Sequence, residues 1–221
     1  MQIIYHGHSC FKLKGKLGTV LMDPYADEIG LTMPKESADI VVISHDHFDH
    51  NDLVKISGTA KHPQPLIVNH AGAYEAGGIS VFGVQSWHDE NEGADRGKNV
   101  IFTVFMDGLN VCHLGDLGAV PTPEMVSEIG EVDVLLVPVG GHFTLLTYEK
   151  VMETVQLFNP MIFIPMHYKT PLHKEANFGD LKTLEKFLNE YGVAPKPITK
   201  LEVEKGRLPE EMELVVLERD I

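Results

Sequence analysis

The stretch VVISHDHFDHND, Val41 to Asp52, decides the interpretation of this sequence. Its apolar, β-branched start reads as a strand that is covered on both faces and ends at Ile43. Three histidines and three aspartates then follow within eight residues, and all of them are side chains that bind metals. This arrangement predicts a ligand-rich loop held at the end of a buried strand.

The spacing His-x-His-x-Asp-His puts four ligand-type side chains on one tight loop. Alternation along an extended backbone sends His45 and His47 to the same side. Asp49 and His50 lie one turn further on, near the start of a helix expected around Asn51. Such a loop can serve two neighbouring metals, one with each pair. Imidazole and carboxylate ligands without thiolates suit zinc, with manganese or iron as alternatives.

Composition narrows the class of protein. The chain has 221 residues, 43% hydrophobic and 23% charged, which is typical of an ordinary soluble protein, and we expect one domain over residues 1–221. A net charge of −14 repels phosphate backbones and argues against a nucleic-acid partner. No apolar run is long enough for a bilayer, so we expect no membrane association and a cytoplasmic location. Cys10 and Cys112 read as buried free thiols.

The first half of the chain reads as short strands and turns, and the second half alternates helices with strands. Asp107-Gly108 predicts a hairpin turn. The expected strands are Gln2–Tyr5, Cys10–Leu13, Thr19–Met22, Asp39–Ser44, Leu66–Asn69, Ile79–Ser86, Val100–Met106, Asn110–Leu114, Val132–Val137, Met161–Pro165 and a final pair, Pro197–Val203 with Glu213–Leu217. The expected helices are Thr122–Ile129, Thr147–Phe158 and Phe178–Tyr191, the last closed by Gly192.

Chemically rich residues follow these strands, where rigid scaffolds hold active sites. Seven such coincidences predict that the loops share one edge of the sheets and form a single site. The residues concerned are His6 and His8, Asp23, the 45–50 cluster, His88, Asp116, His142 and His167.

With these motifs, the sequence resembles the metallo-β-lactamase superfamily. The 45–50 signature matches, and a lone His, an Asp in a Gly-Asp turn and a late His follow in the family's order at His88, Asp116 and His167. The segments YHGHSCF, HDENEGADRGKN, CHLGDLG, PVGGHFT and IPMHYKT look like a stand-alone subgroup of Zn-dependent metallo-hydrolases. This subgroup is similar to the ascorbate-6-phosphate lactonase group.

The resemblance implies an α/β (α+β) fold, a four-layer αββα sandwich with a two-metal site at one sheet edge. Carried over residue by residue, one metal is held by His45, His47 and His88, and the other by Asp49, His50 and His167, with Asp116 bridging both. The implied cofactors are two divalent ions, zinc first, manganese or iron as alternatives. A metal-bridged hydroxide then attacks a small-molecule ester, lactone or phosphoester, and Asp49 orients or relays the proton of the nucleophile.

Residues around this ligand set carry further expectations. Two roles are open for Asp23, and they are compatible: a turn-former before Pro24, and an acceptor that fixes the tautomer of a ligand histidine. His8, His142 and Tyr168 are the predicted substrate contacts, although a role for His142 as a helix cap at the rim stays open. Arg96 either pairs with a nearby carboxylate, the favoured alternative, or contacts an anionic substrate.

An alternative function belongs to a different class. A non-catalytic metal-binding or sensing protein could retain the same fold and ligands. Metal-dependent turnover of a generic ester or phosphodiester separates the two hypotheses. The sequence leaves the physiological substrate and the oligomeric state open.

Overall fold

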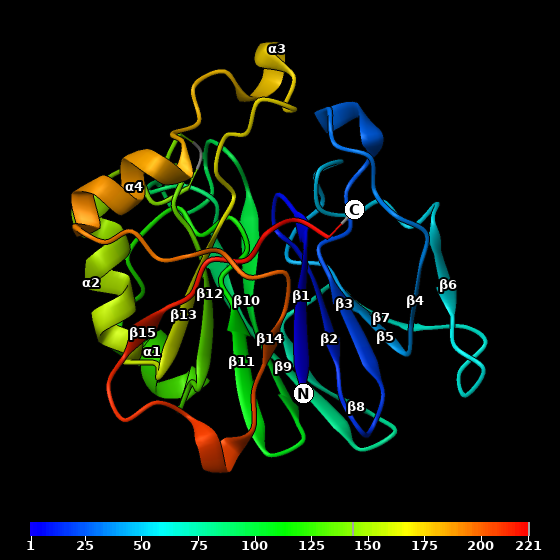
Figure 1. The fold of residues 1–221 in the computed structure, drawn as a ribbon. Coiled ribbons are helices and arrows are strands. Elements are labelled where there is room, and N and C mark those ends of the chain that lie inside the picture. Colours follow the sequence, from blue (N-terminus) through cyan, green and yellow to red (C-terminus); the bar gives the residue numbers. More distant parts are fainter. Residues whose placement is uncertain (143, 221) are drawn as a thin grey trace.

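Two mixed β-sheets face each other in the computed structural model, which describes residues 1–142 and 144–220 (Figure 1). The first sheet has the order β14-β1-β2-β3-β5-β7, and the second has the order β15-β13-β12-β11-β10-β9-β8. Strands of the first sheet are β1 (Gln2–Gly7), β2 (Cys10–Lys14), β3 (Thr19–Met22), β5 (Ile40–Val42), β7 (Leu66–Val68) and β14 (Leu201–Glu202). Strands of the second are β8 (Gly72–Ala76), β9 (Ile79–Trp87), β10 (Lys98–Met106), β11 (Leu109–His113), β12 (Val134–Pro138), β13 (Ile162–Met166) and β15 (Glu213–Leu214).

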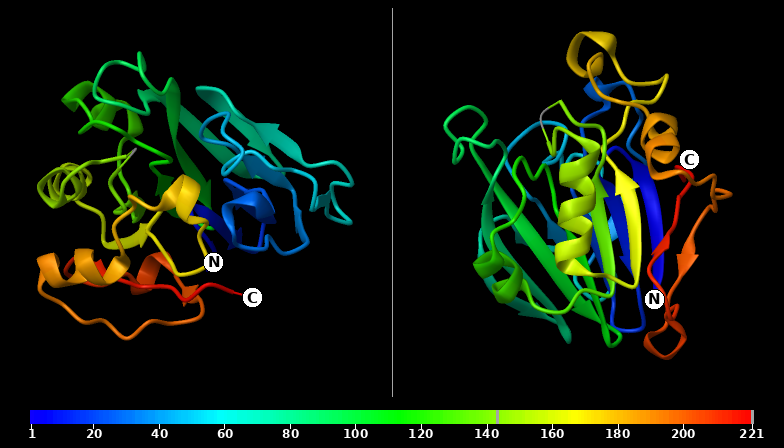
Figure 2. Two further views of the ribbon diagram at one scale, coloured as in Figure 1. Left: turned by 90° about the horizontal axis from the view of Figure 1, so that it is seen from above. Right: turned by 90° about the vertical axis from the view of Figure 1, so that its left-hand side faces the viewer.

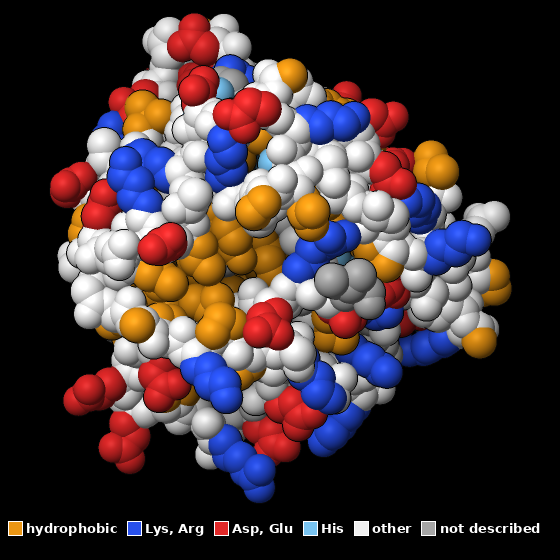
Figure 3. Space-filling model, turned by 45° about the horizontal axis from the view of Figure 1, so that its top comes forward, with side chains coloured by type: hydrophobic (Ala, Val, Ile, Leu, Met, Phe, Trp, Pro, Cys, Tyr) orange, Lys and Arg blue, Asp and Glu red, His pale blue; other side chains and the backbone are white. Residues whose placement is uncertain are grey.

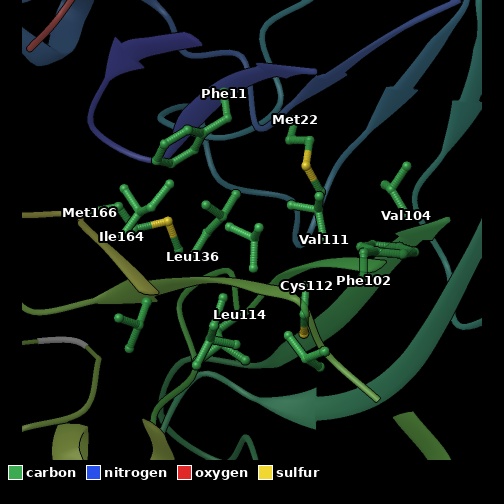
Figure 4. Close-up of a cluster of buried hydrophobic side chains, with 14 of the residues drawn as sticks. Phe11, Met22, Phe102, Val104, Val111, Cys112, Leu114, Leu136, Ile164 and Met166 are labelled. Carbon is green, nitrogen blue, oxygen red and sulfur yellow. The ribbon is translucent and has the colours of Figure 1, made fainter. Parts of the chain in front are cut away.

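The core fills the space between the sheets, because alternate residues of each strand point inward. Phe11 and Met22 of the first sheet face Val111 and Leu136 of the second, as Figure 4 shows. All four side chains are fully buried. Burial of each contributes about 1.5–3 kcal/mol. The strands are therefore held rigidly, and so are the loops that leave their ends.

Helices cover the outer face of the second sheet (Figure 2). They are α1 (Pro123–Ile129), α2 (Tyr148–Phe158) and α4 (Leu184–Tyr191), with a short α3 (Glu175–Phe178) at the top of Figure 1. The side chains of Thr122, Thr147 and Thr183 cap α1, α2 and α4 by accepting a backbone N–H of the first turn.

The outer face of the first sheet has a different cover. Tyr25, Ile29, Leu31 and Met33 come from the segment after β3 and pack on Leu21 of that strand. This segment contains a 3-10 turn (Asp27–Ile29), and a small sheet of β4 (Glu36–Ala38) and β6 (Ile56–Gly58) lies beside it. The expected α/β fold with two facing sheets is confirmed. The outer layer over the first sheet differs from the expected helical layer, since it consists of a 3-10 turn and short strands.

Most of the expected strands are confirmed to within two residues at each end. The predicted hairpin turn is also confirmed, since Asp107 and Gly108 both have positive φ angles of 56° and 80° between β10 and β11. Three short strands were missed, β4, β6 and β8.

Two expectations about helices are wrong. No helix starts near Asn51; a turn closed by His50 N–H donating to the His47 carbonyl leads into extended chain. The helix expected from Phe178 is split, because the Lys182 N–H bonds to the Gly140 carbonyl and Thr183 starts α4 afresh. The final pair of strands is shorter than expected: β14 joins β1, β15 joins β13, and a single parallel bridge between Ile198 and Leu217 links the two segments.

Among the described residues, we find no helix with the length and apolar character needed to cross a bilayer.

Candidate metal centre

The loops that follow β5, β9, β11 and β13 meet at one edge of the two sheets. They bring together the seven predicted ligand residues, which are His45, His47, Asp49, His50, His88, Asp116 and His167. Each loop leaves a buried strand, so its first side chains are held by the core rather than by the loop itself. The prediction that these strand ends share one edge is therefore confirmed.

The ligand atoms form two groups. Nitrogens of His45, His47 and His88 lie within 4.8 Å of one another. Asp49, His50 and His167 form the second group, whose ligand atoms also lie within 4.8 Å of one another. A ring nitrogen of His8 lies within the same distance of them. These are the two sets that the resemblance implies.

Asp116 lies between the two groups. Its Oδ2 atom is 3.1 Å from His88 Nε2 and 3.8 Å from His45 Nε2 on one side. On the other side it is 3.2 Å from His167 Nε2 and 3.3 Å from His50 Nε2. Burial alone would raise the pKa of Asp116, but His167 and His50 outweigh it and hold that pKa well below its usual range. A carboxylate in this position can serve cations on both sides.

Unpaired polar atoms test whether metal ions fit this centre. Nε2 atoms of His45, His50 and His167, and Oδ1 of Asp116, are buried and have no hydrogen-bond partner within the described part of the chain. Each such atom costs about 1–3 kcal/mol if it stays unpaired. Coordination would satisfy all four, and the donor set of imidazole and carboxylate suits zinc, manganese or iron. The residues present therefore fit divalent cations.

Asp23 orients one histidine of each group. His50 Nδ1 donates to Asp23 Oδ2 at 2.8 Å, and the Ser44 hydroxyl donates to the same oxygen at 2.6 Å. His45 Nδ1 lies 2.9 Å from that hydroxyl. Burial would raise the pKa of Asp23, but His113 and His50 keep it below its usual value, so it is a carboxylate. Both histidines then carry Nδ1–H and turn Nε2 toward Asp116. Of the two expectations for Asp23, these contacts support the acceptor.

Asn99 holds the Gly-Asp turn. Its Oδ1 accepts the Asp116 N–H at 3.0 Å, while its Nδ2 donates to Ser86 Oγ and to the Leu114 carbonyl. Gly115 has a positive φ of 58°, and a Cβ atom there would overlap Asn99 Oδ1 and Ser44 Cβ. Only glycine fits this turn, which explains why a Gly precedes Asp116.

A cleft of about 370 Å³ opens onto both groups. Arg96 supplies the single Lys or Arg side chain among its described lining residues, and Phe48 and Phe178 form an apolar wall. Small areas of histidine show between the surrounding loops in Figure 3, in agreement with the burial of most of the cluster. The lining residues are His47, Phe48, Asp49, His88, Arg96, Asp116, His167, Ala176, Asn177 and Phe178.

The three predicted substrate contacts are placed differently. His142 lines a neighbouring cleft with His88 and Arg96, so it lies at the rim. Tyr168 packs in the core near Tyr5 and is absent from the cleft lining, because the chain after His167 turns back into the sheet interior. His8 is fully buried, with its Nε2 3.0 Å from Asp49 Oδ2. These positions do not support direct substrate contact by Tyr168 or His8.

Sequence reasoning missed three residues of the site. Ser44 and Asn99 link the ligands to the scaffold, and neither belongs to a metal-ligand pattern. His173 is buried, with Nε2 3.2 Å from His8 Nδ1. Burial lowers the pKa of His173 to about 3 and that of His8 to about 4. The sequence offers no signal for this contact, which joins residues 165 positions apart.

Comparisons with known proteins agree with this site. The chain matches the family model of the β-lactamase superfamily domain over residues 2–167. UPF0173 metal-dependent hydrolases from Thermoplasma acidophilum and Methanoregula boonei are 30% and 34% identical; the matches cover 90% and 83% of this chain and 98% and 89% of theirs. A crystal structure of a Thermotoga maritima protein, assigned to the Zn-dependent hydrolases of the metallo-β-lactamase superfamily, has a TM-score of 0.76 and 36% identity. It covers 98% of this chain and 97% of that one.

Two facing sheets with a His- and Asp-lined centre at their edge define a metal-dependent hydrolase of the metallo-β-lactamase superfamily. Within this superfamily, the chain belongs to the UPF0173 metal-dependent hydrolases.

Proposed function

We propose that this hydrolase uses two divalent cations, zinc first among them, to cleave a small-molecule ester, lactone or phosphoester. The observation that carries the proposal is the pair of ligand groups with Asp116 between them. His45, His47 and His88 would hold one cation, and Asp49, His50 and His167 the other, with Asp116 shared. A site with a single cation would have no use for the second group.

The chemistry of the bound cations would be to acidify a water molecule and to polarise the attacked carbonyl or phosphoryl oxygen. Asp49 lines the cleft and can orient the attacking water or accept its proton through the oxygen not bonded to His8. Burial would raise the pKa of Asp49, but His50 and His8 keep it below its usual range. Asp49 is therefore ionised, which suits a ligand and an acceptor that orients the attacking water.

The cleft wall supports a substrate with an anionic group. Arg96 follows a loop that is folded around the Asp89 carboxylate, which accepts the backbone N–H groups of Asn91, Gly93, Asp95 and Arg96 itself. This loop brings Arg96 to the wall of the cleft that His47 and His88 also line, in a protein whose net charge is −14. A phosphate or carboxylate on the substrate would find its cationic partner here.

Turnover by the metal-loaded protein tests the proposal. After reconstitution with zinc or manganese, we expect hydrolysis of at least one of p-nitrophenyl acetate, a simple lactone and bis(p-nitrophenyl) phosphate. Asp116→Ala should lower the rate by orders of magnitude. Asp46→Asn is the matched control, because Asp46 lies exposed in the same loop, where its carboxylate accepts a hydrogen bond from the Asn51 side chain. Metal bound without turnover of any ester would favour a sensing protein.

A further inference from the structure

Two buried histidines that belong to neither predicted ligand set lie in a line behind Asp49. His8 Nε2 is 3.0 Å from Asp49 Oδ2, and His8 Nδ1 is 3.2 Å from His173 Nε2. The His8 backbone is fixed as well, because its carbonyl accepts the Tyr5 hydroxyl at 2.9 Å and the His167 N–H at 2.8 Å. With a positive φ of 55°, His8 holds a backbone conformation that few side chains adopt, and this conformation aims its ring at Asp49.

One backbone amide sets the direction of the whole line. The Thr170 N–H donates to His173 Nδ1 at 3.0 Å, and a backbone amide can only donate. His173 Nδ1 therefore carries a lone pair, and the ring proton lies on Nε2, which faces His8 Nδ1. His8 must accept at Nδ1 and carry its own proton on Nε2. That proton points at Asp49 Oδ2.

We infer that Thr170, His173 and His8 form a one-way hydrogen-bond chain that positions Asp49, and that His8 is a positioning residue rather than a metal ligand or a substrate contact. The inference rests on the proposed function for its role in catalysis. Geometry alone would allow His8 to be a fourth ligand of the second group, since its nitrogen lies within 4.8 Å of the other ligand atoms. The proton on Nε2 removes the lone pair that coordination needs. The second cation would then have the three ligands of its own group and the shared Asp116, and no fourth histidine would occupy the position left for water or substrate.

The hydrogen-bond chain also joins Asp49 to a wall of the cleft. Thr170 and His173 lie in the segment between β13 and α3, which continues into the cleft-lining residues Ala176, Asn177 and Phe178. The Lys174 N–H anchors this segment to the Ile29 carbonyl at 2.9 Å. The segment that would contact substrate is thus the one that holds the Asp49 carboxylate in its orientation.

Nuclear magnetic resonance of the zinc-loaded protein, labelled with ¹⁵N-histidine, tests the inference without using activity. Long-range ¹H–¹⁵N spectra should show His8 and His173 as neutral rings with the proton on Nε2. Assignments come from His8→Gln and His173→Gln. A zinc-bound nitrogen on His8, or a proton on Nδ1 of either ring, would overturn the inference.

Zinc affinity gives a second readout. In competition with a chromophoric chelator, His8→Leu should bind one of the two zinc ions about 10–100-fold less tightly. The leucine side chain cannot replace the N–H that His8 donates to Asp49 Oδ2. His8→Gln can still donate through its amide and should stay within a few-fold of wild type. His62→Gln, a substitution at a distant histidine that contacts Asp39, is the control and should change nothing. Unchanged affinity in folded His8→Leu would refute the positioning role; if that variant does not fold, the tautomer measurement on wild type still decides. If the tautomers are as stated but no substrate is hydrolysed, the proposed function is wrong, whereas the hydrogen-bond chain from Thr170 to Asp49 is still supported.

Discussion

Three donors bond to the Asp23 carboxylate: the Ser44 N–H, the Ser44 hydroxyl and the ring nitrogen of His50. Asp23→Asn keeps the size but replaces one acceptor oxygen with a donating amide. His50 or Ser44 must then lose its hydrogen bond, and the tautomer that presents His50 Nε2 is no longer fixed. We expect metal affinity to fall about 10–100-fold, measured by chelator competition. Asp46→Asn is the matched control, and equal affinities for the two variants would contradict this role.

Glu36 lies between His6 and Lys12, and its Oε1 is 3.1 Å from His6 Nε2. Burial would raise the pKa of Glu36, but the bonds from His6 and Lys12 lower it to about 2. Because the pKa is lower in the folded state than in the unfolded chain, about 4.3, Glu36 stabilises the fold above that value. This contribution, roughly 2–3 kcal/mol, should be lost as the pH falls toward 2.

Urea unfolding of wild type and Glu36→Gln, both free of metal, between pH 2 and 6 measures this linkage. The free energies of unfolding should differ most near pH 6 and converge toward pH 2. A difference that does not change with pH would contradict it.

At this scale, sequence reasoning reached the residues whose partners are close in the chain or at strand ends. Four of the seven ligand candidates fall within residues 45–50, and the others each follow a strand. His173 was out of reach, because its burial depends on how residues 169–178 fold back over the turn between β1 and β2. Tyr168 was misjudged for a related reason: adjacency to His167 says nothing about which way the chain turns next.

At the scale of elements, the turn between β11 and Asp116 is tightly constrained. Gly115→Ala would force a methyl group against Asn99 and Ser44, at a positive φ. We expect a loss of roughly 3 kcal/mol in unfolding free energy together with weaker metal binding. Gly192→Ala is the matched control, since Gly192 also has a positive φ, 80°, but nothing lies within 4 Å of its added Cβ. It should cost about 1 kcal/mol. Equal losses in urea unfolding would contradict the packing argument.

Sequence patterns identified elements well where local chemistry defines them. Thr122 and Thr147 cap the helices that they predicted, and Asp107-Gly108 makes its turn. The sequence patterns failed where contacts between distant parts of the chain decide the secondary structure. The predicted last helix does not begin until Leu184, because the Lys182 N–H donates to the Gly140 carbonyl and the Lys182 carbonyl accepts the Lys169 N–H. This arrangement depends on the position of β12 and β13.

Considered as a whole molecule, the chain closes on itself through its last strands, which join different sheets. β14 pairs with β1 of the first sheet and β15 with β13 of the second, so the C-terminal segment ties the two sheets together. The metal centre ties them a second time, since His45 and His50 come from the first sheet and His88, Asp116 and His167 from the second.

Metal binding should therefore stabilise the whole fold. With free zinc at 100 times its Kd, the gain is about 2.7 kcal/mol per site. For a chain of this length, that corresponds to a rise in Tm of roughly 5–10 °C for each site filled, or roughly 10–20 °C for both, over the chelator-treated protein, measured by calorimetry. Equal Tm values with and without zinc would show that the centre does not couple the sheets.

We propose that two cations bind at this centre, one on each side of Asp116. Anomalous diffraction from a crystal of the zinc-loaded protein, collected at the zinc edge, tests it most directly. Two peaks are predicted, one beside His45, His47 and His88 and the other beside Asp49, His50 and His167, with Asp116 in reach of both. A single peak, or peaks away from these residues, would contradict the two-metal account.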